Sequence, residues 1–185
     1  MGIIYRFVAN HDSAVKQVEE LYTSAFPPDE RRDFEVFASL LADDSVPSSV
    51  LGAFDDGGER LLSFISFWEL PGGMMYLEHF AVIPQMRGMG IGRTVFSHFL
   101  DEVASTIVLE VEPPVDVIAV KRIRFYESLG LKLWGDFAYV QPPYGPDKSP
   151  LELKLMTHGD VSQPMLEKAV AEVRRLVYGC KASAE

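Results

Sequence analysis

The sequence has almost no cysteine, and this scarcity excludes two classes of protein. Among its 185 residues the one cysteine is Cys180. A single thiol can form neither an internal disulfide nor a cysteine-rich metal site. The 4 histidines show no spacing typical of metal ligands. We therefore expect no disulfide framework and no metal centre.

Long apolar runs and an excess of positive charge are also missing. No segment approaches the roughly 20 apolar residues of a membrane-spanning helix, and the N-terminal residues lack the pattern of a signal peptide. Lys and Arg number 17 against 27 Asp and Glu, so the formal charge is −10. General nucleic-acid binding requires a basic face. We expect a cytoplasmic protein that binds neither a membrane nor nucleic acid.

What remains is the composition of an ordinary globular protein, with 48% hydrophobic and 24% charged residues. The length suits one domain with a sizeable core. We expect residues 1–160 to form that domain. Residues 161–185 would add a helical extension, whose apolar stripe packs either on the domain itself or on a second copy in a homodimer.

Periodicity and turn residues predict an order of strands and helices. An uninterrupted run of three strands among helices indicates an α/β fold of the α+β kind, a mixed sheet with helices on both faces. The expected strands cover residues 3–8, 50–54, 61–70, 75–82, 106–111, 132–140 and 151–156, and the expected helices cover 13–25, 33–41, 91–104, 117–129 and 163–178.

The most informative segment is a glycine run between a strand and a helix. It reads Arg87-Gly88-Met89-Gly90-Ile91-Gly92. Alternate glycines let a ligand approach the backbone closely, and a helix that begins there presents unpaired N–H groups to an anion. A dinucleotide fingerprint would need its last glycine at Arg93 or Val95, and the lysine and spacer of a P-loop are missing. We expect this turn to bind a pyrophosphate of another kind.

The strand, the R-x-x-G-x-G run and the helix resemble the acetyl-coenzyme A (acetyl-CoA) loop of the GNAT superfamily of N-acetyltransferases. A second segment, Phe125-Tyr126-Glu127-Ser128-Leu129-Gly130-Leu131, resembles the superfamily's F-Y-x-x-x-G-F block. The order of elements is similar over residues 3–156, which leaves the last helix outside the resemblance. Two departures are Ala119, where the block often has Asn, and the insertion Pro113-Pro114.

The resemblance implies a sheet of about seven mostly antiparallel strands that splays between the fourth and fifth. It also implies acetyl-CoA as co-substrate and no metal. The backbone of Phe80, Ala81 and Val82 would bind the pantetheine arm, and the amides of Arg87, Gly88, Met89, Gly90, Ile91 and Gly92 would hold the pyrophosphate.

Three side chains are candidates for the chemistry. Tyr126 matches the tyrosine that commonly protonates the departing thiolate in the family. The attacking amine must lose a proton, and Glu110 resembles a catalytic glutamate of some members. Glu78, on the strand before the glycine run, is an equal contender, and a chain of waters is a third option. The structural alternatives are a core tyrosine and two ordinary strand carboxylates.

Two expectations concern neighbouring side chains. Strand alternation should point His79 away from Glu78, so that the two would not act as a pair. Arg31 and Arg32 lie in the loop that lines the acceptor cleft by analogy. They are candidates for binding an acidic substrate, but a solvated charge cluster is the commoner explanation.

The sequence thus predicts an acyltransferase that moves an acetyl group from acetyl-CoA to the amine of a small molecule or peptide. The alternative is a non-catalytic acetyl-CoA-binding regulator or scaffold of the same fold. The segments expected to build the acceptor cleft follow Phe26 and span residues 141–150.

Overall fold

The computed structural model describes residues 2–103 and 106–180. The elements follow the predicted order, with two short 3₁₀ turns added. They are β1 (Ile4–Phe7), α1 (Val15–Ala25), η1 (Pro28–Glu30), α2 (Phe34–Leu41), β2 (Ser48–Phe54), β3 (Leu61–Glu69), β4 (Met75–Val82), η2 (Pro84–Met86), α3 (Ile91–Glu102), β5 (Ile107–Val111), α4 (Val117–Glu127), β6 (Lys132–Gln141), β7 (Leu151–His158) and α5 (Gln163–Leu176).

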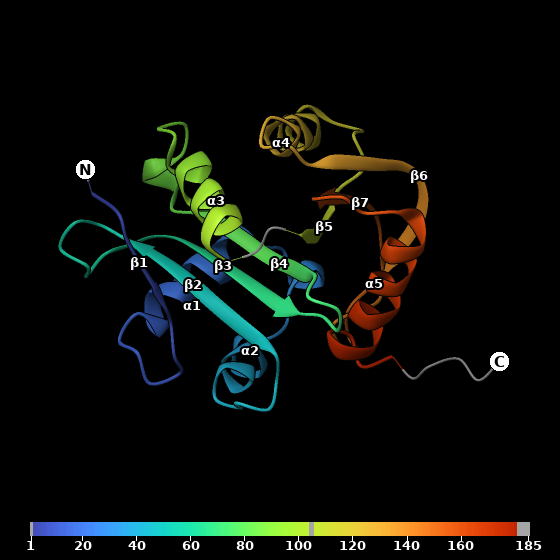
Figure 1. The fold of residues 1–185 in the computed structure, drawn as a ribbon. Helices are drawn as coiled ribbons and strands as arrows, with labels where there is room; N and C mark the ends of the chain where they lie inside the picture. Colours follow the sequence, from blue (N-terminus) through green and yellow to red (C-terminus); the bar gives the residue numbers. More distant parts are fainter. Residues whose placement is uncertain (1, 104–105, 181–185) are drawn as a thin grey trace.

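One sheet of seven strands runs in the order β1-β2-β3-β4-β5-β7-β6. Its neighbouring strands are antiparallel except β4 and β5. This parallel pair joins Met75, Tyr76 and Leu77 to Ile107, Val108 and Leu109, and then ends. Beyond these residues the two strands diverge (Figure 1). The predicted mixed sheet and its splay between the fourth and fifth strands are therefore confirmed.

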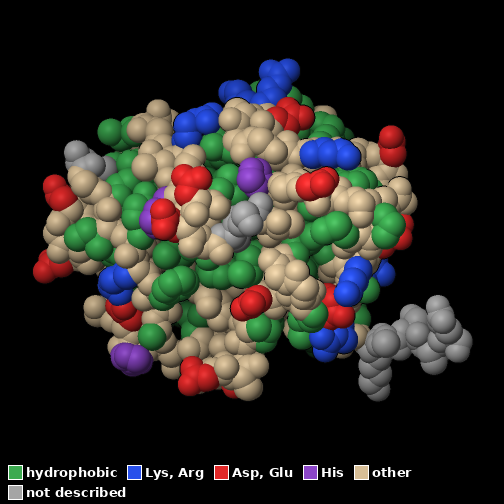
Figure 2. Space-filling view, viewed as in Figure 1, with side chains coloured by type: hydrophobic (Ala, Val, Ile, Leu, Met, Phe, Trp, Pro, Cys, Tyr) green, Lys and Arg blue, Asp and Glu red, His purple; other side chains and the backbone are tan. Residues whose placement is uncertain are grey.

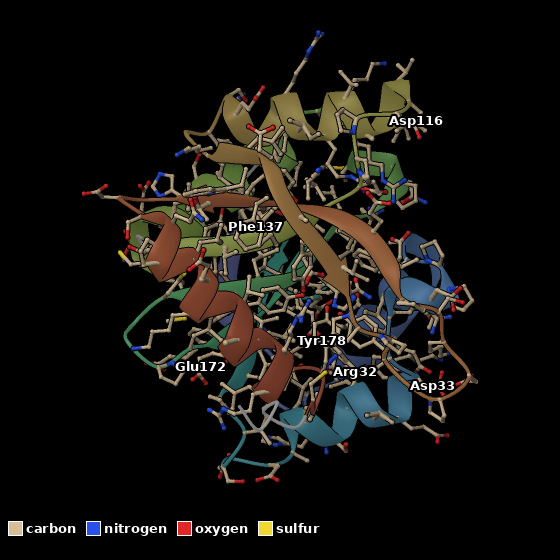
Figure 3. All side chains as sticks on the ribbon, turned by 90° about the vertical axis from the view of Figure 1, so that its right-hand side faces the viewer. Arg32, Asp33, Asp116, Phe137, Glu172 and Tyr178 are labelled. Atoms are coloured by element: carbon tan, nitrogen blue, oxygen red, sulfur yellow. The ribbon has the colours of Figure 1, made fainter. Side chains whose placement is uncertain are left out.

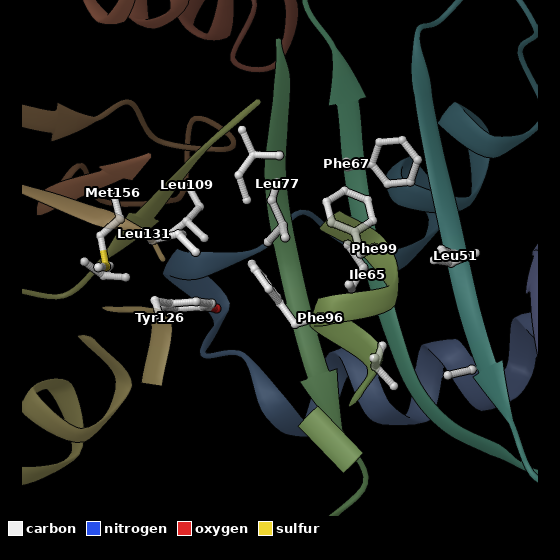
Figure 4. Packing of buried hydrophobic residues seen from close by; sticks show 14 of the residues in the cluster. Leu51, Ile65, Phe67, Leu77, Phe96, Phe99, Leu109, Tyr126, Leu131 and Met156 are labelled. Atoms are coloured by element: carbon white, nitrogen blue, oxygen red, sulfur yellow. The ribbon is translucent and has the colours of Figure 1, made fainter. Parts of the chain in front are cut away.

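The helices cover both faces of the sheet (Figure 1). On one face α3 and α4 pack on alternate residues of β3, β4 and β5, among them Ile65, Leu77 and Leu109. Figure 4 shows Phe96 and Phe99 of α3 in this cluster. The opposite face is covered by α1 and α2 over β2 and β3 and by α5 over β5 to β7. Where β4 and β5 separate, the sheet has a gap between its two faces.

The C-terminal helix α5 buries its apolar stripe on its own chain. Leu166, Ala169 and Val173 pack in one cluster with Tyr76 and Val108 of the central strands. An amphipathic helix must cover its apolar face, and here the sheet covers it. A homodimer stays a prediction.

The element ends differ from the sequence prediction by a few residues. Strand β7 continues past Met156 to His158, because β5 offers it partners as far as Ile107. Helix α3 ends at Glu102, and residue 104, where the prediction ended, lies outside the described residues, as do 181–185 of the expected extension. Within the described ranges no helix has both the length and the apolarity that a membrane crossing requires.

Candidate active site

The fork between β4 and β5 opens into a cleft of about 790 Å³. Glu78 and Glu110 each follow the last paired residue of their strand, so the two carboxylates flank the point of divergence. Both lie on the face of α1, α2 and α5. Tyr126 comes from α4 on the opposite face and lines the same cleft. The three candidate catalytic residues of the sequence analysis are therefore brought together, although their elements pack on different faces.

A β-bulge at Glu78 overturns the expectation that Glu78 and His79 point to opposite faces. Ser66 of β3 faces His79 and the next residue, Phe67, faces Leu77, so Glu78 is the extra residue on β4. The bulge breaks the alternation of side chains. As a result the His79 Nδ1 atom lies 3.9 Å from a Glu78 carboxylate oxygen. Burial lowers the pKa of His79, and its Nε2 lies 3.0 Å from the carbonyl oxygen of Glu30.

Glu78 is held on both carboxylate oxygens. Arg32 donates to Oε1 in an ion pair, and the Trp68 indole N–H donates to Oε2 at 2.8 Å. Arg32 is 6% exposed, and its guanidinium lies 4.6 Å from the ring centroid of Tyr144. The prediction of a solvated charge cluster is therefore wrong for Arg32. The reason is that a buried carboxylate 46 positions along the chain requires a cation.

Glu110 lies among tyrosine hydroxyls. Tyr139 donates to Oε1, and the Tyr178 hydroxyl lies 3.1 Å from Oε2. Burial raises the pKa of Glu110 to about 7, although the hydrogen bonds from Tyr139, Tyr178 and Tyr76 act in the opposite direction. A carboxylate that titrates near neutral pH can accept a proton and release it again. Of the two candidate bases, Glu110 is the one with no cation as its ion-pair partner among the described residues.

Tyr126 lies with its ring between the helices and the fork. Figure 4 shows its hydroxyl pointing toward β4, beside Phe96, and the two ring centroids are 5.2 Å apart. The residue is 7% exposed. Burial raises its pKa, so the phenol keeps its proton at neutral pH and remains a donor.

The glycine run forms the other end of the cleft. Gly88 and Gly90 have φ angles of +76° and +84°, which glycine adopts without strain, and Gly90 is the N-cap of α3. The amides of Arg87 and Met89 donate to carbonyls of the loop itself, at 3.2 and 3.4 Å. Within the described ranges no acceptor is found for the amides of Gly88, Gly90, Ile91 and Gly92. Gly92 lies over the side chains of Val82, Phe80 and Phe125, which a Cβ there would meet at ordinary van der Waals distances.

Replacing Gly90 with Val tests this end of the cleft. A β-branched residue at a φ of +84° is strained and would displace the loop. We expect acetyl-CoA to bind at least about tenfold more weakly, because a displaced loop loses amide contacts worth about 1.4 kcal/mol or more. The measurement is the Kd from calorimetry.

Gly73 is a matched control for this variant. It has the same φ of +84°, and neither glycine has an atom within 4 Å of a built Cβ, but Gly73 lies in the turn before β4, away from the cleft. Gly73→Val should cost similar stability and leave the Kd unchanged. An equal loss of affinity in both variants would contradict a binding role for the loop.

Charge divides the cleft into two ends. Arg87, Arg93, Lys121 and Arg122 line the end near the glycine run. In Figure 2 blue Lys and Arg side chains gather at the upper edge, where Figure 1 places α4. Glu78 and Glu110 line the cleft at the fork, while Glu112 pairs with Arg122 and Glu30 interacts electrostatically with both of these residues. An anionic ligand suits the first end and a cationic one suits the second.

Sequence reasoning missed four polar residues of this second end: Tyr139, Gln141, Tyr144 and Tyr178. The Gln141 side chain is 3% exposed and lines the cleft. Its Nε2 has no hydrogen-bond partner among the described residues, so it is available to a ligand oxygen. The spacing of these residues carried no signal, because β6, its following loop and α5 meet at the cleft only in the fold. The described ranges hold no group of three or more His, Cys, Asp or Glu placed to bind a metal ion.

Comparisons with known proteins give a family. A GNAT-family protein from Bacteroides thetaiotaomicron is 32% identical, with a TM-score of 0.87 over 96% of this chain and 99% of its own. Two solved structures share the fold at 15% identity. Arabidopsis thaliana NAA60 in complex with acetyl-CoA has a TM-score of 0.60 over 85% of this chain and 98% of its own. Vibrio cholerae spermidine N-acetyltransferase with CoA and spermine has 0.61 over 84% and 94%.

No curated protein matches the sequence at a significant level. The family description "Acetyltransferase (GNAT) family" matches residues 15–131, more than half of the chain. With the fold, the forked strands and the close relative, this match shows that the chain belongs to the acetyltransferase (GNAT) family.

Proposed function

We propose that this protein transfers an acetyl group from acetyl-CoA to the amine of a small molecule or peptide. The observation that carries the proposal is the fork itself. It brings the carboxylate Glu110 from one face and the phenol Tyr126 from the other into one cleft, with unpaired amides of the glycine run at its anionic-ligand end. The relatives named above include an acetyl-CoA complex and a polyamine acetyltransferase.

In this proposal each end of the cleft binds one substrate. The free amides of Gly88, Gly90, Ile91 and Gly92, together with α3, would hold the pyrophosphate. Phe80, Ala81 and Val82 lie beyond the last β4–β5 pair, so their backbone groups on that side would bind the pantetheine arm. The acceptor amine would enter between α1, α2 and the loop after β6. Its positive charge suits Glu110, and Gln141 would donate to an oxygen of the acceptor.

The proposed reaction is a direct attack. Glu110 takes a proton from the acceptor ammonium, and the free amine attacks the thioester carbonyl carbon. The C–N bond forms, the C–S bond breaks, and Tyr126 donates its proton to the departing sulfur. The second proton that the amine nitrogen loses as the amide forms returns to Tyr126 through water and restores the phenol. The products are an acetamide and free CoA, and the proton on Glu110 passes to solvent. Holding both substrates in one cleft supplies much of the acceleration. Glu78, bound to Arg32 and Trp68, would shape the site and not accept the proton.

The remaining parts of the proposal concern the whole chain. Residues 1–160 would form the catalytic domain and 161–185 its C-terminal extension, in a cytoplasmic enzyme that needs no metal. The apolar face of α5 is buried within one chain, so catalysis would not require a second copy.

Replacing Tyr126 with Phe tests the acid. The variant keeps the ring, which packs against Phe96, and loses only the proton donor. We expect kcat to fall by about 10²-fold, the lower end for a positioned general acid, while the Kd for acetyl-CoA stays unchanged. Tyr5→Phe, on the edge strand β1, is the control. An unchanged kcat in Tyr126→Phe would mean that Tyr126 is not the acid and that solvent protonates the thiolate.

The function itself is tested in two steps. Acetyl-CoA should raise the melting temperature, since a ligand that binds only the folded state stabilises it. Thiol release should then follow with at least one class in a panel of amines that includes polyamines, amino acids and peptides with free N-termini. Stabilisation without thiol release across the panel would favour the alternative, a regulator that binds acetyl-CoA. Absence of both would overturn the proposal.

A further inference from the structure

The chain just after α5 reaches the acceptor end of the cleft. Tyr178 is two residues beyond the end of that helix, and its hydroxyl lies 3.1 and 3.4 Å from the two carboxylate oxygens of Glu110. It also lies 3.0 Å from the Tyr76 hydroxyl and 3.4 Å from that of Tyr144. The family match covers residues 15–131, so Tyr178 lies outside the matched residues.

A second contact fixes the same segment. Nη2 of Arg32 donates to the main-chain carbonyl of Val177, and Nη1 of the same guanidinium pairs with Glu78. Figure 3 shows Arg32 and Tyr178 close together at the end of α5. One buried cation thus ties the segment after α5 to the bulge of β4. Because Arg32 fixes the neighbouring Val177, the Tyr178 hydroxyl is held in a defined position next to Glu110.

The neighbours of Glu110 are mostly neutral donors. The neighbours come from several parts of the fold. The charged pair Glu78 and Arg32 is neutral as a whole, and Arg174 lies over the ring of Tyr139. The groups that face this end are Tyr76 and Glu78 of β4, Tyr139 of β6, Tyr144 of the following loop, Tyr178 after α5 and Arg32 before α2. Hydroxyl donors therefore supply most of the stabilisation of a charged Glu110.

We propose that Tyr178 is a positioning residue for Glu110, and that through it the segment after α5 sets the pH range in which the enzyme works. The inference rests on the proposed function, in which Glu110 accepts the proton of the acceptor amine. Tyr178 touches neither substrate. It orients the carboxylate and stabilises its charged form by donating a hydrogen bond.

The direction of the effect follows from the contact. Loss of the Tyr178 hydroxyl removes a donor that lowers the pKa of Glu110, so Glu110 would stay protonated to a higher pH. A base works only when deprotonated. The acidic limb of kcat/KM against pH should therefore move upward in Tyr178→Phe, by about one unit, which is a tenfold lower rate at a fixed pH below the limb.

The experiment measures this limb and the titration of Glu110 separately. Kinetics of the full-length wild type, Tyr178→Phe and the control Tyr5→Phe are recorded from pH 5 to 9 with one amine acceptor. The midpoint of Glu110 is read by NMR from ¹³C-labelled glutamate, assigned with Glu110→Gln, and this reading needs no turnover. We expect both the acidic limb and the Glu110 midpoint to move upward in Tyr178→Phe. In the control Tyr5→Phe, both should match the wild type.

The outcomes separate this inference from the proposed function. An unmoved NMR midpoint in Tyr178→Phe overturns the inference, whatever the kinetics show. A moved midpoint with an unmoved limb leaves the coupling of Tyr178 to Glu110 intact and overturns Glu110 as the base. Should the Phe variant fold poorly, 3-fluorotyrosine at position 178 keeps the shape and strengthens the donor. The midpoint should then fall, and a midpoint that stays or rises contradicts the inference.

Discussion

Replacing Glu110 with Gln is expected to lower kcat/KM for the acceptor by about 10²-fold or more. A positioned general base contributes 10²- to 10⁴-fold, and the carboxamide keeps the size of the side chain while it cannot accept the proton. The pKa of Glu110 lies at about 7, so the wild-type rate should rise as pH rises through 7. Glu110→Gln should lose that rise. Steady-state kinetics against pH measure both effects.

Two controls accompany this variant. Glu152→Gln changes an exposed carboxylate on β7 and should leave the profile unchanged. The Kd of acetyl-CoA should stay within about twofold in Glu110→Gln, since the pyrophosphate end is distant in the cleft. Full activity in Glu110→Gln together with an inactive Glu78→Gln would transfer the role of base to Glu78. Full activity in both would favour a chain of waters.

Replacing Arg32 with Met is expected to lower the free energy of unfolding by about 3–5 kcal/mol, because Glu78 would remain buried without its cation. For a chain of this length that loss lowers Tm by on the order of 10 °C. The Glu78 side chain is 2% exposed, so water cannot replace the guanidinium. Chemical denaturation measures the change directly.

A double variant separates the pair from the packing of Arg32. Arg32→Met with Glu78→Gln removes both charges, and most of the lost stability should return. The neighbouring Arg31→Met is the control for a change of side chain in the same loop, and it should cost less than about 1 kcal/mol, as for other partly exposed positions. A small loss in the single Arg32 variant would mean that Glu78 takes up a proton or reaches solvent.

Local sequence predicted the fold and the turn formed by the glycine run. The order of strands and helices follows from periodicity and turn residues, which are local properties. The glycine run is also readable, because the positive φ of Gly88 and Gly90 and the start of a helix require particular residues at adjacent positions. A ligand site built from the backbone of a few consecutive residues leaves its signature in one short segment.

The acceptor end could not be predicted in the same way. Its geometry depends on a bulge at Glu78, which is set by the register of β3 against β4 and not by any residue type. The Arg32–Glu78 pair spans 46 positions, and Tyr178 lies 68 positions from Glu110. Contacts of this kind exist only once the strands and α5 are in place. Strand alternation therefore gave the wrong direction for the His79 side chain, and the usual explanation of a loop charge cluster was wrong for Arg32.

In the proposed function, the cleft that opens where β4 and β5 diverge would hold each reactant at its own end. Neither molecule then has to depart before the other arrives, so double-reciprocal plots should intersect, as for a ternary complex. An inhibitor that joins both reactants covalently would have to occupy both ends of this cleft at once. Its release should be slow for that reason.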